Sequence, residues 1–285
     1  MYKILLTLFV LTAFTACRKS DDTLSDFDDN GKKYNVSFTS AFEQSIEPYK
    51  SGSLPQTLNE VKPEYTRIYN LDQGGALVSS TRTDNKLPAG NYVAVFVYSN
   101  TFFSRVYGLG GLSEVLNFNE VFLDTRPSVV SQTVAINDIF YKKLYFTVKK
   151  KDINENVILD RIVAGLEVTI QDTMPEAVAR LELTVNDAAV FNFKNDARES
   201  SVSKVKNFLP TDKILNAYVL GTGTRSVKIR AYDSNGLVLK EKTVDAPFIS
   251  NKVTPIRCTL FNDTAPMVLA NNTVKELSLT SGGTR

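Results

Sequence analysis

Apolar and polar residues alternate along much of this chain. Four stretches place an apolar side chain at every second position, which is the period of a β-strand with one buried face. They are residues 144–148, 162–170, 181–185 and 227–231. Residues 92–98 are apolar at every position, as in a central strand that is covered on both faces. The pattern therefore predicts a molecule built mainly from strands.

Turn-forming residues separate these strands, and helical periodicity is scarce. Turn signals fall at residues 72–75, 88–91, 186–187 and 234–236. Short helices are predicted only around residues 40–50, 137–141 and 174–178. Many short strands with few short helices predict an all-β protein made of antiparallel β-sandwiches.

The most polar stretch inside the predicted folded region is residues 149–156, which begins with three lysines. A polar stretch of this kind is typical of a linker between domains. It predicts an N-terminal sandwich over residues 34–150 and a C-terminal sandwich over residues 151–262. Residues 263–285 follow as a C-terminal tail.

The N-terminus has a pattern of its own. Lys3 is followed by an apolar run and then by small residues up to Cys17, which indicates a secretory signal too short to span a bilayer stably. The segment Phe14-Thr15-Ala16-Cys17 resembles the bacterial lipobox, in which the cysteine is lipidated and becomes the first residue of the mature protein. Residues 1–16 are then removed, and acyl chains on Cys17, palmitate among them, hold the protein on a membrane. The alternative is an ordinary signal peptide with an incidental cysteine.

Residues 17–33 form a polar tether with little apolar surface to bury. Its acidic residues are Asp21, Asp22, Asp26, Asp28 and Asp29. An acidic segment directly after the cysteine resembles the signal that sends lipoproteins of Bacteroidota to the outer face of the outer membrane. The resemblance implies a lipid-anchored protein that faces the cell exterior. A plain solvated linker is the alternative.

Charge and composition exclude several functions. The chain has 33 basic and 31 acidic residues, and this balance gives no field to hold nucleic acid or a membrane surface. It contains no histidine, which excludes Ser-His and Cys-His catalysis and histidine-ligated zinc. With Cys17 lipidated, Cys258 has no disulfide partner, and it is interpreted as a core residue. We predict no catalytic, metal-binding or cofactor-binding residue and no enzymatic activity.

Several segments together resemble the fimbrillin superfamily of Bacteroidota, the subunits of type V pili. Residues 65–78 resemble the strand, turn and strand that open the first sandwich, and residues 87–92 match a Leu-Pro-x-Gly-x-Tyr pattern. Residues 138–141 and 159–168 resemble the interdomain signature of the anchor and minor-subunit branch. Residues 249–261 resemble the closing strand, although Cys258 stands where a small residue is usual.

This resemblance implies two tandem transthyretin-like β-sandwiches and a structural role in lipoprotein-derived surface fimbriae. The implied partners are other fimbrial subunits joined by strand exchange, the outer membrane, and host or bacterial surface ligands. Strand exchange is β-augmentation, in which an open sheet edge pairs with an extended strand of a neighbour. Assembly of this kind needs no cofactor, and the resemblance thus implies a fimbrial subunit that supports adhesion.

The tail contains two apolar patches that are candidates for a donor strand. Their residues are Met267, Val268, Leu269, Val274, Leu277 and Leu279. The alternatives are that these residues pack on their own domain or fray. In polymerising fimbrillins, cleavage after an arginine frees the first strand. Arg67 and Arg82 stand in no obvious linker before a strand, which favours an anchor or minor subunit.

Two further features leave alternatives open. Thr23 and Thr264 lie in Asp-Thr-aliphatic or Asp-Thr-Ala contexts that resemble O-glycosylation sites of Bacteroidota. A surface glycan-binding lipoprotein of a polysaccharide uptake system is the alternative function. Such sites usually stack tryptophan on sugars, and this chain has no tryptophan. Tyrosines would have to replace it, the candidates being Tyr98, Tyr107, Tyr141 and Tyr145.

Overall fold

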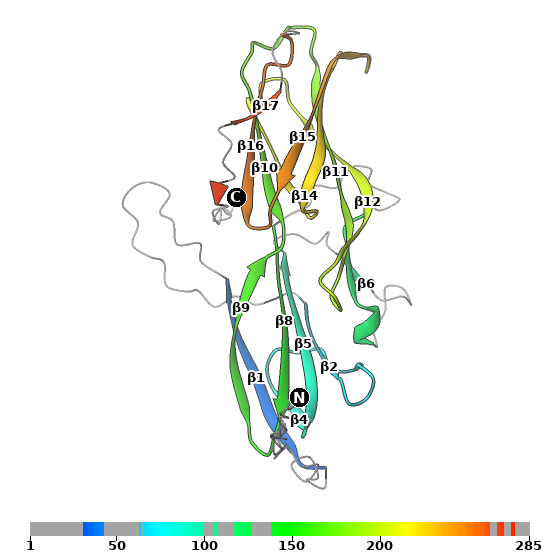
Figure 1. The fold of residues 1–285 in the computed structure, drawn as a ribbon, viewed down its shortest axis with the longest axis vertical. Helices are drawn as coiled ribbons and strands as arrows, with labels where there is room; N and C mark the ends of the chain where they lie inside the picture. Colours follow the sequence, from blue (N-terminus) through cyan, green and yellow to red (C-terminus); the bar gives the residue numbers. More distant parts are fainter. Residues whose placement is uncertain are drawn as a thin grey trace, which may run out of the picture.

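The structure is a computed structural model of the whole chain. It describes residues 31–42, 63, 65–99, 105–107, 117–126, 138–262, 267–270 and 275–276. In this part of the chain nearly all regular structure is β-strand, arranged in two lobes stacked along the long axis (Figure 1).

The lower lobe in Figure 1 is built on a seven-stranded sheet with the order β3-β2-β5-β8-β9-β1-β4. Its strands are β1 (Lys33–Phe42), β2 (Tyr65–Asn70), β3 (Ala76–Ser79), β4 (Asn85–Pro88), β5 (Gly90–Ser99), β8 (Ile139–Val148) and β9 (Ile153–Arg161). The sheet curls so that β1 faces β5, and the rings of Phe38 and Phe96 lie 5.1 Å apart. One core cluster fills the inside of this curl.

Strand β5 has core on both faces, as its continuous apolar sequence predicts. Tyr92, Ala94 and Phe96 point into the curl, whereas Val93, Val95 and Val97 belong to a second core cluster on the opposite face. All six side chains are buried. The central position of this strand in the sheet explains why its sequence does not alternate.

The upper lobe is a sandwich of two sheets. The five-stranded sheet contains β13 (Ile214–Val219), β10 (Ala164–Ile170), β16 (Lys252–Cys258), β17 (Val268–Leu269) and β18 (Lys275–Glu276). The six-stranded sheet contains β15 (Val238–Phe248), β14 (Gly223–Tyr232), β11 (Arg180–Asn192), β12 (Arg198–Phe208), β7 (Phe122–Asp124) and β6 (Arg105–Tyr107). The third core cluster lies between these two sheets.

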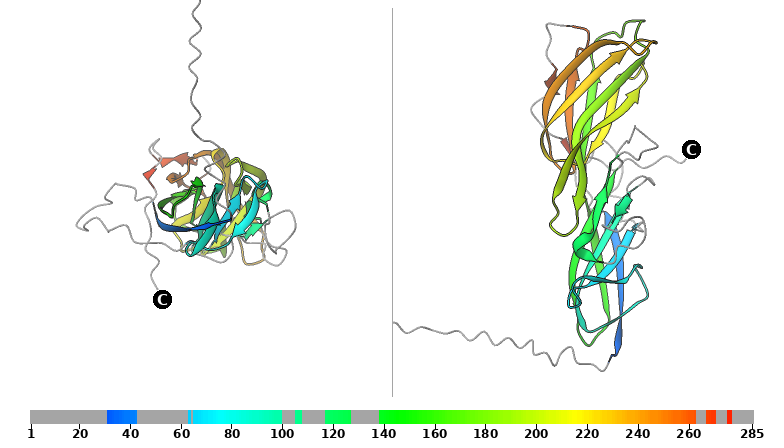
Figure 2. Two further views of the ribbon diagram at one scale, coloured as in Figure 1. Left: turned by 90° about the horizontal axis from the view of Figure 1, so that it is seen from below. Right: turned by 90° about the vertical axis from the view of Figure 1, so that its right-hand side faces the viewer.

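The two lobes are interlocked by strands that cross between them. β6 and β7 follow β5 in the sequence, yet β7 pairs with the far end of β11 in the register Val190↔Asp124. The hairpin of β11 and β12 extends beyond its own lobe toward the lower one (Figure 2). The joint, defined as the region where β7, β8 and β9 meet β11, is therefore built from both halves of the chain.

The all-β fold class with stacked sheets is confirmed, but not every pairing is antiparallel. β1 lies parallel to β9, and β10 lies parallel to β16. Residues 139–141 are strand rather than helix, and residues 174–178 form a turn without a helix. Strand β1 runs through residues 40–42, and the rest of the helix predicted over residues 40–50 lies outside the described residues. Residues Phe118–Glu120 form a short 3₁₀ helix.

The predicted domain boundary falls inside the seven-stranded sheet. β8 and β9 form a hairpin in which Tyr141 pairs with Asp160, and residues 149–152 are its turn. This hairpin stays in one sheet because β9 also pairs with β1 over seven residues. The lysine-rich stretch is polar because it is an exposed turn, and the change of sheet comes later, between Arg161 and Ala164.

Candidate functional site

The first strand, β1, is an internal part of the lower sheet. It pairs with β4 on one edge and with β9 on the other. Tyr34, Val36 and Phe38 alternate inward and are buried. The ring of Phe38 also lies 5.5 Å from that of Phe146 on β8. Removing β1 would therefore open a wide apolar groove in the sheet.

The described part of the tail, residues 267–270 and 275–276, covers an edge of the upper lobe through short pairings. β17 pairs with β16 at two positions, Ile256↔Leu269 and Arg257↔Val268. β18 adds two more pairs, Lys252↔Glu276 and Val253↔Lys275. Met267 is buried in the upper core, whereas Val268 is 44% exposed. Within the single chain, the first apolar patch of the tail thus packs on its own domain.

An aromatic cluster fills the apolar part of the joint. The ring of Tyr141 on β8 stacks on Phe193 at 5.1 Å and meets the edge of Phe191 at 5.0 Å. Phe118 and Leu123 are buried in the same cluster. Rings from both halves of the chain therefore share one core, which opposes rotation of one lobe against the other.

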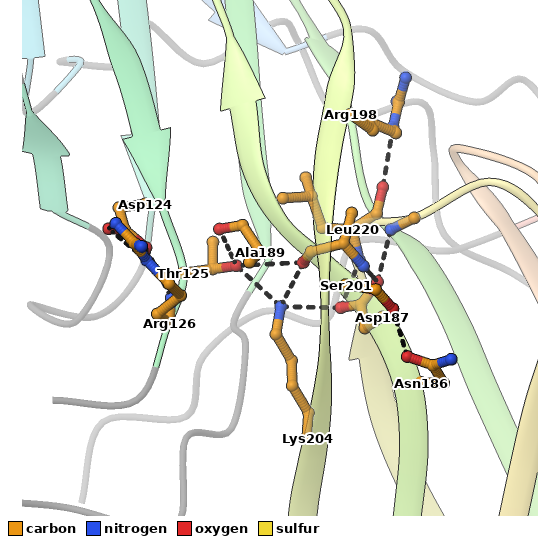
Figure 3. Close-up of polar contacts among 12 residues, drawn as sticks. Asp124, Thr125, Arg126, Asn186, Asp187, Ala189, Arg198, Ser201, Lys204 and Leu220 are labelled. Carbon is orange, nitrogen blue, oxygen red and sulfur yellow. Dashed lines mark hydrogen bonds and ion pairs between the residues drawn. The ribbon is translucent and has the colours of Figure 1, made fainter. Parts of the chain in front are cut away.

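A buried ion pair lies beside this cluster (Figure 3). Lys204 Nζ donates to Asp187 Oδ2 and to Thr125 Oγ1, both at 2.8 Å, and to the backbone oxygen of Ala188 at 2.9 Å. Each proton of the ammonium group therefore has an acceptor. Burial lowers the pKa of Lys204, and the Asp187 carboxylate opposes that shift.

The carboxylate of Asp187 has further donors from the backbone. Leu220 N donates to Oδ2 at 3.0 Å, and Gly221 N donates to Oδ1 at 2.6 Å. Ala188 N also donates to Oδ1, at 2.7 Å. The prediction of a turn at residues 186–187 is wrong, because Asp187 continues inside β11 with its carboxylate fully hydrogen-bonded. This side chain ties β11 to the loop before β14.

A second polar contact joins the lobes through Arg161 at the end of β9. Its guanidinium donates to both oxygens of Asp138, at 2.7 and 2.9 Å, and to Asn251 Oδ1 at 2.8 Å. Arg161 also lies over the ring of Phe140, 4.8 Å from its centroid. Bidentate pairs of this kind are strong and directional. Asp138 and Arg161 belong to the segments that resemble the interdomain signature.

A third contact holds the tip of the β11–β12 hairpin on β8. Lys143 Nζ donates to Asp196 at 3.0 Å and to the backbone oxygen of Phe193 at 2.9 Å. The hydroxyl of Tyr141 donates to Asp196 Oδ1 at 2.9 Å. Burial, together with this carboxylate, raises the pKa of Tyr141, so the hydroxyl stays protonated. Apolar packing and these polar contacts together fix the joint.

Most residues predicted to carry function lie outside the described residues. These are Cys17, Thr23, Thr264, Val274, Leu277 and Leu279. Cys258 is described, and its thiol is buried in the upper core. Burial raises the pKa of this thiol to about 11, which makes it a poor nucleophile.

The candidate tyrosines whose side chains the structure describes, Tyr98, Tyr141 and Tyr145, differ in their exposure. Tyr141 is buried, and Tyr98 packs its ring 4.9 Å from that of Phe42. Tyr145 is 56% exposed, and the side chain of Tyr107 is not described. Among the residues that the structure describes, no group of three or more acidic or cysteine side chains is placed to hold a metal ion. In the same residues, no helix has the length and apolar character needed to cross a membrane.

Asp187 and Lys204 are the residues of the joint that sequence reasoning missed. Asn-Asp is a frequent turn pair, so the pattern pointed away from a strand. Lys204 lies in an alternating polar segment and carries no mark of burial. The contacts that define both residues come from distant parts of the chain.

No protein-family model and no curated protein sequence matches this chain. Solved structures do resemble it. One is a protein from Bacteroides thetaiotaomicron proposed to bind polysaccharide, with TM-score 0.54 and 8% identity, covering 87% of this chain and 98% of that chain. A second is a candidate adhesin from Bacteroides ovatus, with TM-score 0.52 and 11% identity, covering 86% and 96%. A third is the fimbrial anchor protein Mfa2 from Porphyromonas gingivalis, with TM-score 0.50 and 11% identity, covering 86% and 98%.

The chain has the fold of these adhesin and fimbrial proteins. The match covers nearly the full length of each of the three structures, so both lobes take part in it. At these identities the likeness concerns the fold and not individual side chains.

Proposed function

We propose that this chain is an anchor or minor subunit of a surface fimbria that supports adhesion. Acyl chains on Cys17 hold it on the outer membrane, facing the cell exterior. A neighbouring subunit joins it by β-strand exchange. The fold shared with the fimbrial anchor protein Mfa2 supports this proposal.

One observation carries the proposal, namely how lightly the outer edge of β16 is closed. In the part of the tail that the structure describes, residues 267–270 and 275–276, β17 and β18 each contribute two paired residues to this edge, and Thr254 and Pro255 lie between them. Short ladders can be replaced by a longer strand, because the incoming strand makes more main-chain hydrogen bonds. The tail is therefore the segment best suited to leave its own edge and to pair with a neighbour.

The placement of arginines favours an anchor or minor subunit over a shaft subunit. The sequence between β1 and β2, residues 43–64, contains lysine but no arginine. Arg67 lies within β2, and the backbone oxygen of Arg82 accepts a hydrogen bond from Phe38 N of β1. Cleavage after arginine therefore has no site that would release β1 alone. A subunit that keeps its first strand fits the base or a minor position of a fibre.

We also propose that the two lobes are tandem sandwich domains that act as one body. Their boundary would lie at residues 162–163, where the chain passes from β9 to β10. The interlocked joint would pass tension along the long axis instead of bending. This property suits a protein that bears load between a membrane and a fibre.

The test is immunogold electron microscopy of cells that carry the wild-type chain, Cys17→Ala or a truncation after Asn262. We expect Cys17→Ala to be released into the medium and to leave fibres detached from the cell. The truncated chain should stay on the cell but lose its association with fibres. Cys258→Ala is the matched control for the first variant and should behave as wild type. If the Cys17→Ala chain stays bound and fibres are unchanged, the anchor role fails.

Glycan binding is the second candidate, supported by the shared fold with the Bacteroides thetaiotaomicron protein. Among the tyrosines whose side chains the structure describes, Tyr145 is the one exposed enough to meet a sugar. A glycan array with the mature chain tests it directly. Binding that is lost in Tyr145→Ala, with fibre association unchanged, would favour this function over the fimbrial one.

A further inference from the structure

The sheets of the upper lobe end in strands that pair along one side. Across the upper core, the six-stranded sheet runs from β15 through β14 and β11 to β12 (Figure 1). The five-stranded sheet runs from β13 through β10 to β16, where β17 and β18 pair. In the part of the chain that the structure describes, β12, β13 and β15 each pair with a single strand. The outer side of such a strand offers backbone groups to which another chain can pair.

Strand β15 places two lysines on the face of the sheet that covers the core. Lys242 lies opposite Ile229 and Lys240 lies opposite Ala231, and both partners on β14 are buried in the upper core. Residues directly opposite one another in an antiparallel pair share a face. The two lysines therefore stand where strand alternation would place apolar side chains. The next positions on this face are apolar, namely Val244, Ala246 and Phe248.

Strand β12 has the same arrangement at the opposite side of this sheet. Lys204 lies opposite Val185 and Lys206 lies opposite Leu183, and both partners on β11 are buried in the upper core. Lys204 is also the buried lysine of the joint (Figure 3). Burial lowers the pKa of Lys206, as it does that of Lys204. We call the lysines on the core-facing side of these two strands the edge lysines: Lys204, Lys206, Lys240 and Lys242.

Two of the edge lysines reach across the open sides of the sandwich to the other sheet. Lys206 Nζ donates to the backbone oxygen of Asn216 on β13 at 2.7 Å. Lys242 Nζ donates to the backbone oxygens of Thr259 and Asn262, both at 2.6 Å, in the segment directly after β16. The lysine of β12 thus occupies a backbone acceptor of β13, the end strand of the facing sheet.

The edge of β16 is built from apolar side chains instead. Ile256 and Cys258 are buried in the upper core. Leu269 of β17 pairs with Ile256 and packs against the same core, where Met267 is also buried. The strand that covers this edge therefore faces the core with apolar residues, in contrast to the lysines of β12 and β15.

We infer that the edge lysines prevent strand addition along β12, β13 and β15 and thereby restrict strand exchange to the edge of β16. A strand added beside β12 or β15 would have to pack next to two ammonium groups and remove the water around them. Burying charge in this way is unfavourable, and core-facing charges on end strands oppose edge-to-edge pairing. The restriction to β16 rests on the strand exchange in the proposed function, whereas the block at the other edges stands without it.

The test is light scattering after size-exclusion chromatography of residues 17–285 with Cys17→Ser, the parent chain. Lys240→Val combined with Lys242→Val should self-associate and give at least twice the mass of the parent. Hydrogen exchange should then slow in residues 238–248, because the backbone of a second copy pairs with that edge. Lys206→Val alone should also raise the mass, through β12 and β13.

The matched control is Lys228→Val combined with Arg230→Val. These residues lie on β14, which is paired on both sides, and their replacement removes the same charge. The control should keep the mass of the parent. Equal self-association of the control would overturn the inference, since added apolar surface would then explain the result.

A lysine variant that folds by circular dichroism and keeps the mass of the parent would also overturn the inference. If one lysine variant does not fold, the other decides. Failure of both to fold would overturn the inference too, because the lysines would then be required by the fold itself. None of these measurements involves fibres, so a failure of the proposed function would appear separately, in the electron microscopy.

Discussion

The first strand and the last strands of this chain close sheet edges in very different ways. β1 pairs with β9 over seven residues and with β4 over four, and four of its side chains are buried, namely Tyr34, Val36, Phe38 and Ser40. Within the described residues 267–270 and 275–276, β17 and β18 pair with β16 over two residues each. Among residues 267–270, Met267 is the buried side chain. β1 is therefore an integral strand of its sheet, whereas the described part of the tail covers a sheet edge through few pairings.

The largest expected difference in stability is between a chain that lacks β1 and a chain that lacks the tail. Removal of residues 31–42 exposes the groove that holds Tyr34, Val36 and Phe38. Each such side chain contributes about 1.5–3 kcal/mol, so the sum approaches the whole stability of a domain. Urea unfolding followed by circular dichroism is the measurement. We expect no cooperative transition for the chain without residues 31–42 and a cooperative transition for the chain without residues 263–285. If the chain without β1 folds equally well, β1 is the exchangeable strand and the anchor assignment is wrong.

The joint decides whether the half with β1 and the half with the tail unfold together. Asp187→Ala leaves Lys204 buried without its carboxylate and removes the acceptor of three backbone N–H groups. Breaking a buried pair of this kind costs about 3–5 kcal/mol. We expect urea unfolding to become less stable by that amount and to separate into two transitions. Asp245→Ala, an exposed aspartate on β15, is the control and should change stability by less than about 0.5 kcal/mol.

Much of the fold could be predicted because it depends on local pattern. The alternation in β10 and β14 and the two-sided core of β5 follow directly from their sequences. The turn before β15 follows from Asp233 to Gly236, since Gly236 adopts φ of 82° and Asp233 accepts from Asn235 N. In each case the determining contacts lie within a few residues.

What could not be predicted depends on distant pairing. Asn35 and Asp152 are 117 residues apart in sequence, and no local pattern announces that β1 lies parallel to β9. A polar hairpin turn and a polar linker have the same composition, so the sequence alone does not distinguish the turn at residues 149–152 from a domain boundary. The Asn-Asp pair predicts a turn at Asp187. The sequence does not reveal its buried position in β11, because its donors, Leu220 and Gly221, come from another part of the chain. The contacts of the joint could therefore not be predicted from local sequence patterns.

Single substitutions sharpen the comparison between β1 and the tail. Phe38→Ala removes a ring that contacts both Phe96 and Phe146 and should cost about 3–5 kcal/mol. Met267→Ala should cost about 2 kcal/mol, because a segment held by two paired residues can collapse into the space. Both values come from urea midpoints at a constant slope. A larger loss for Met267→Ala would show that the tail is integral and unsuited to strand exchange.

The smallest effect is a pH dependence at Cys258, which lies on β16 beside the tail. Extending the register of β17 by one residue places Met267 opposite Cys258, so the tail helps to bury the thiol. The folded pKa of about 11 exceeds the ordinary value of 9.0, hence the thiol stabilises the fold below pH 9. The stabilisation is lost progressively as the pH rises from 9 through 11. The loss amounts to about 1.4 kcal/mol at pH 10.

The measurement compares urea unfolding of the Cys17→Ser chain at pH 8 and pH 10 with that of Cys17→Ser combined with Cys258→Ala. Subtracting the pH dependence measured for the second chain removes the contribution of tyrosines that titrate in the same range. Truncation after Asn262 should expose the thiol, lower its pKa and speed its reaction with a disulfide reagent. If truncation leaves both the pH dependence and the reaction rate unchanged, the tail does not cover this edge. The contrast between a built-in first strand and a replaceable tail would then have to be abandoned.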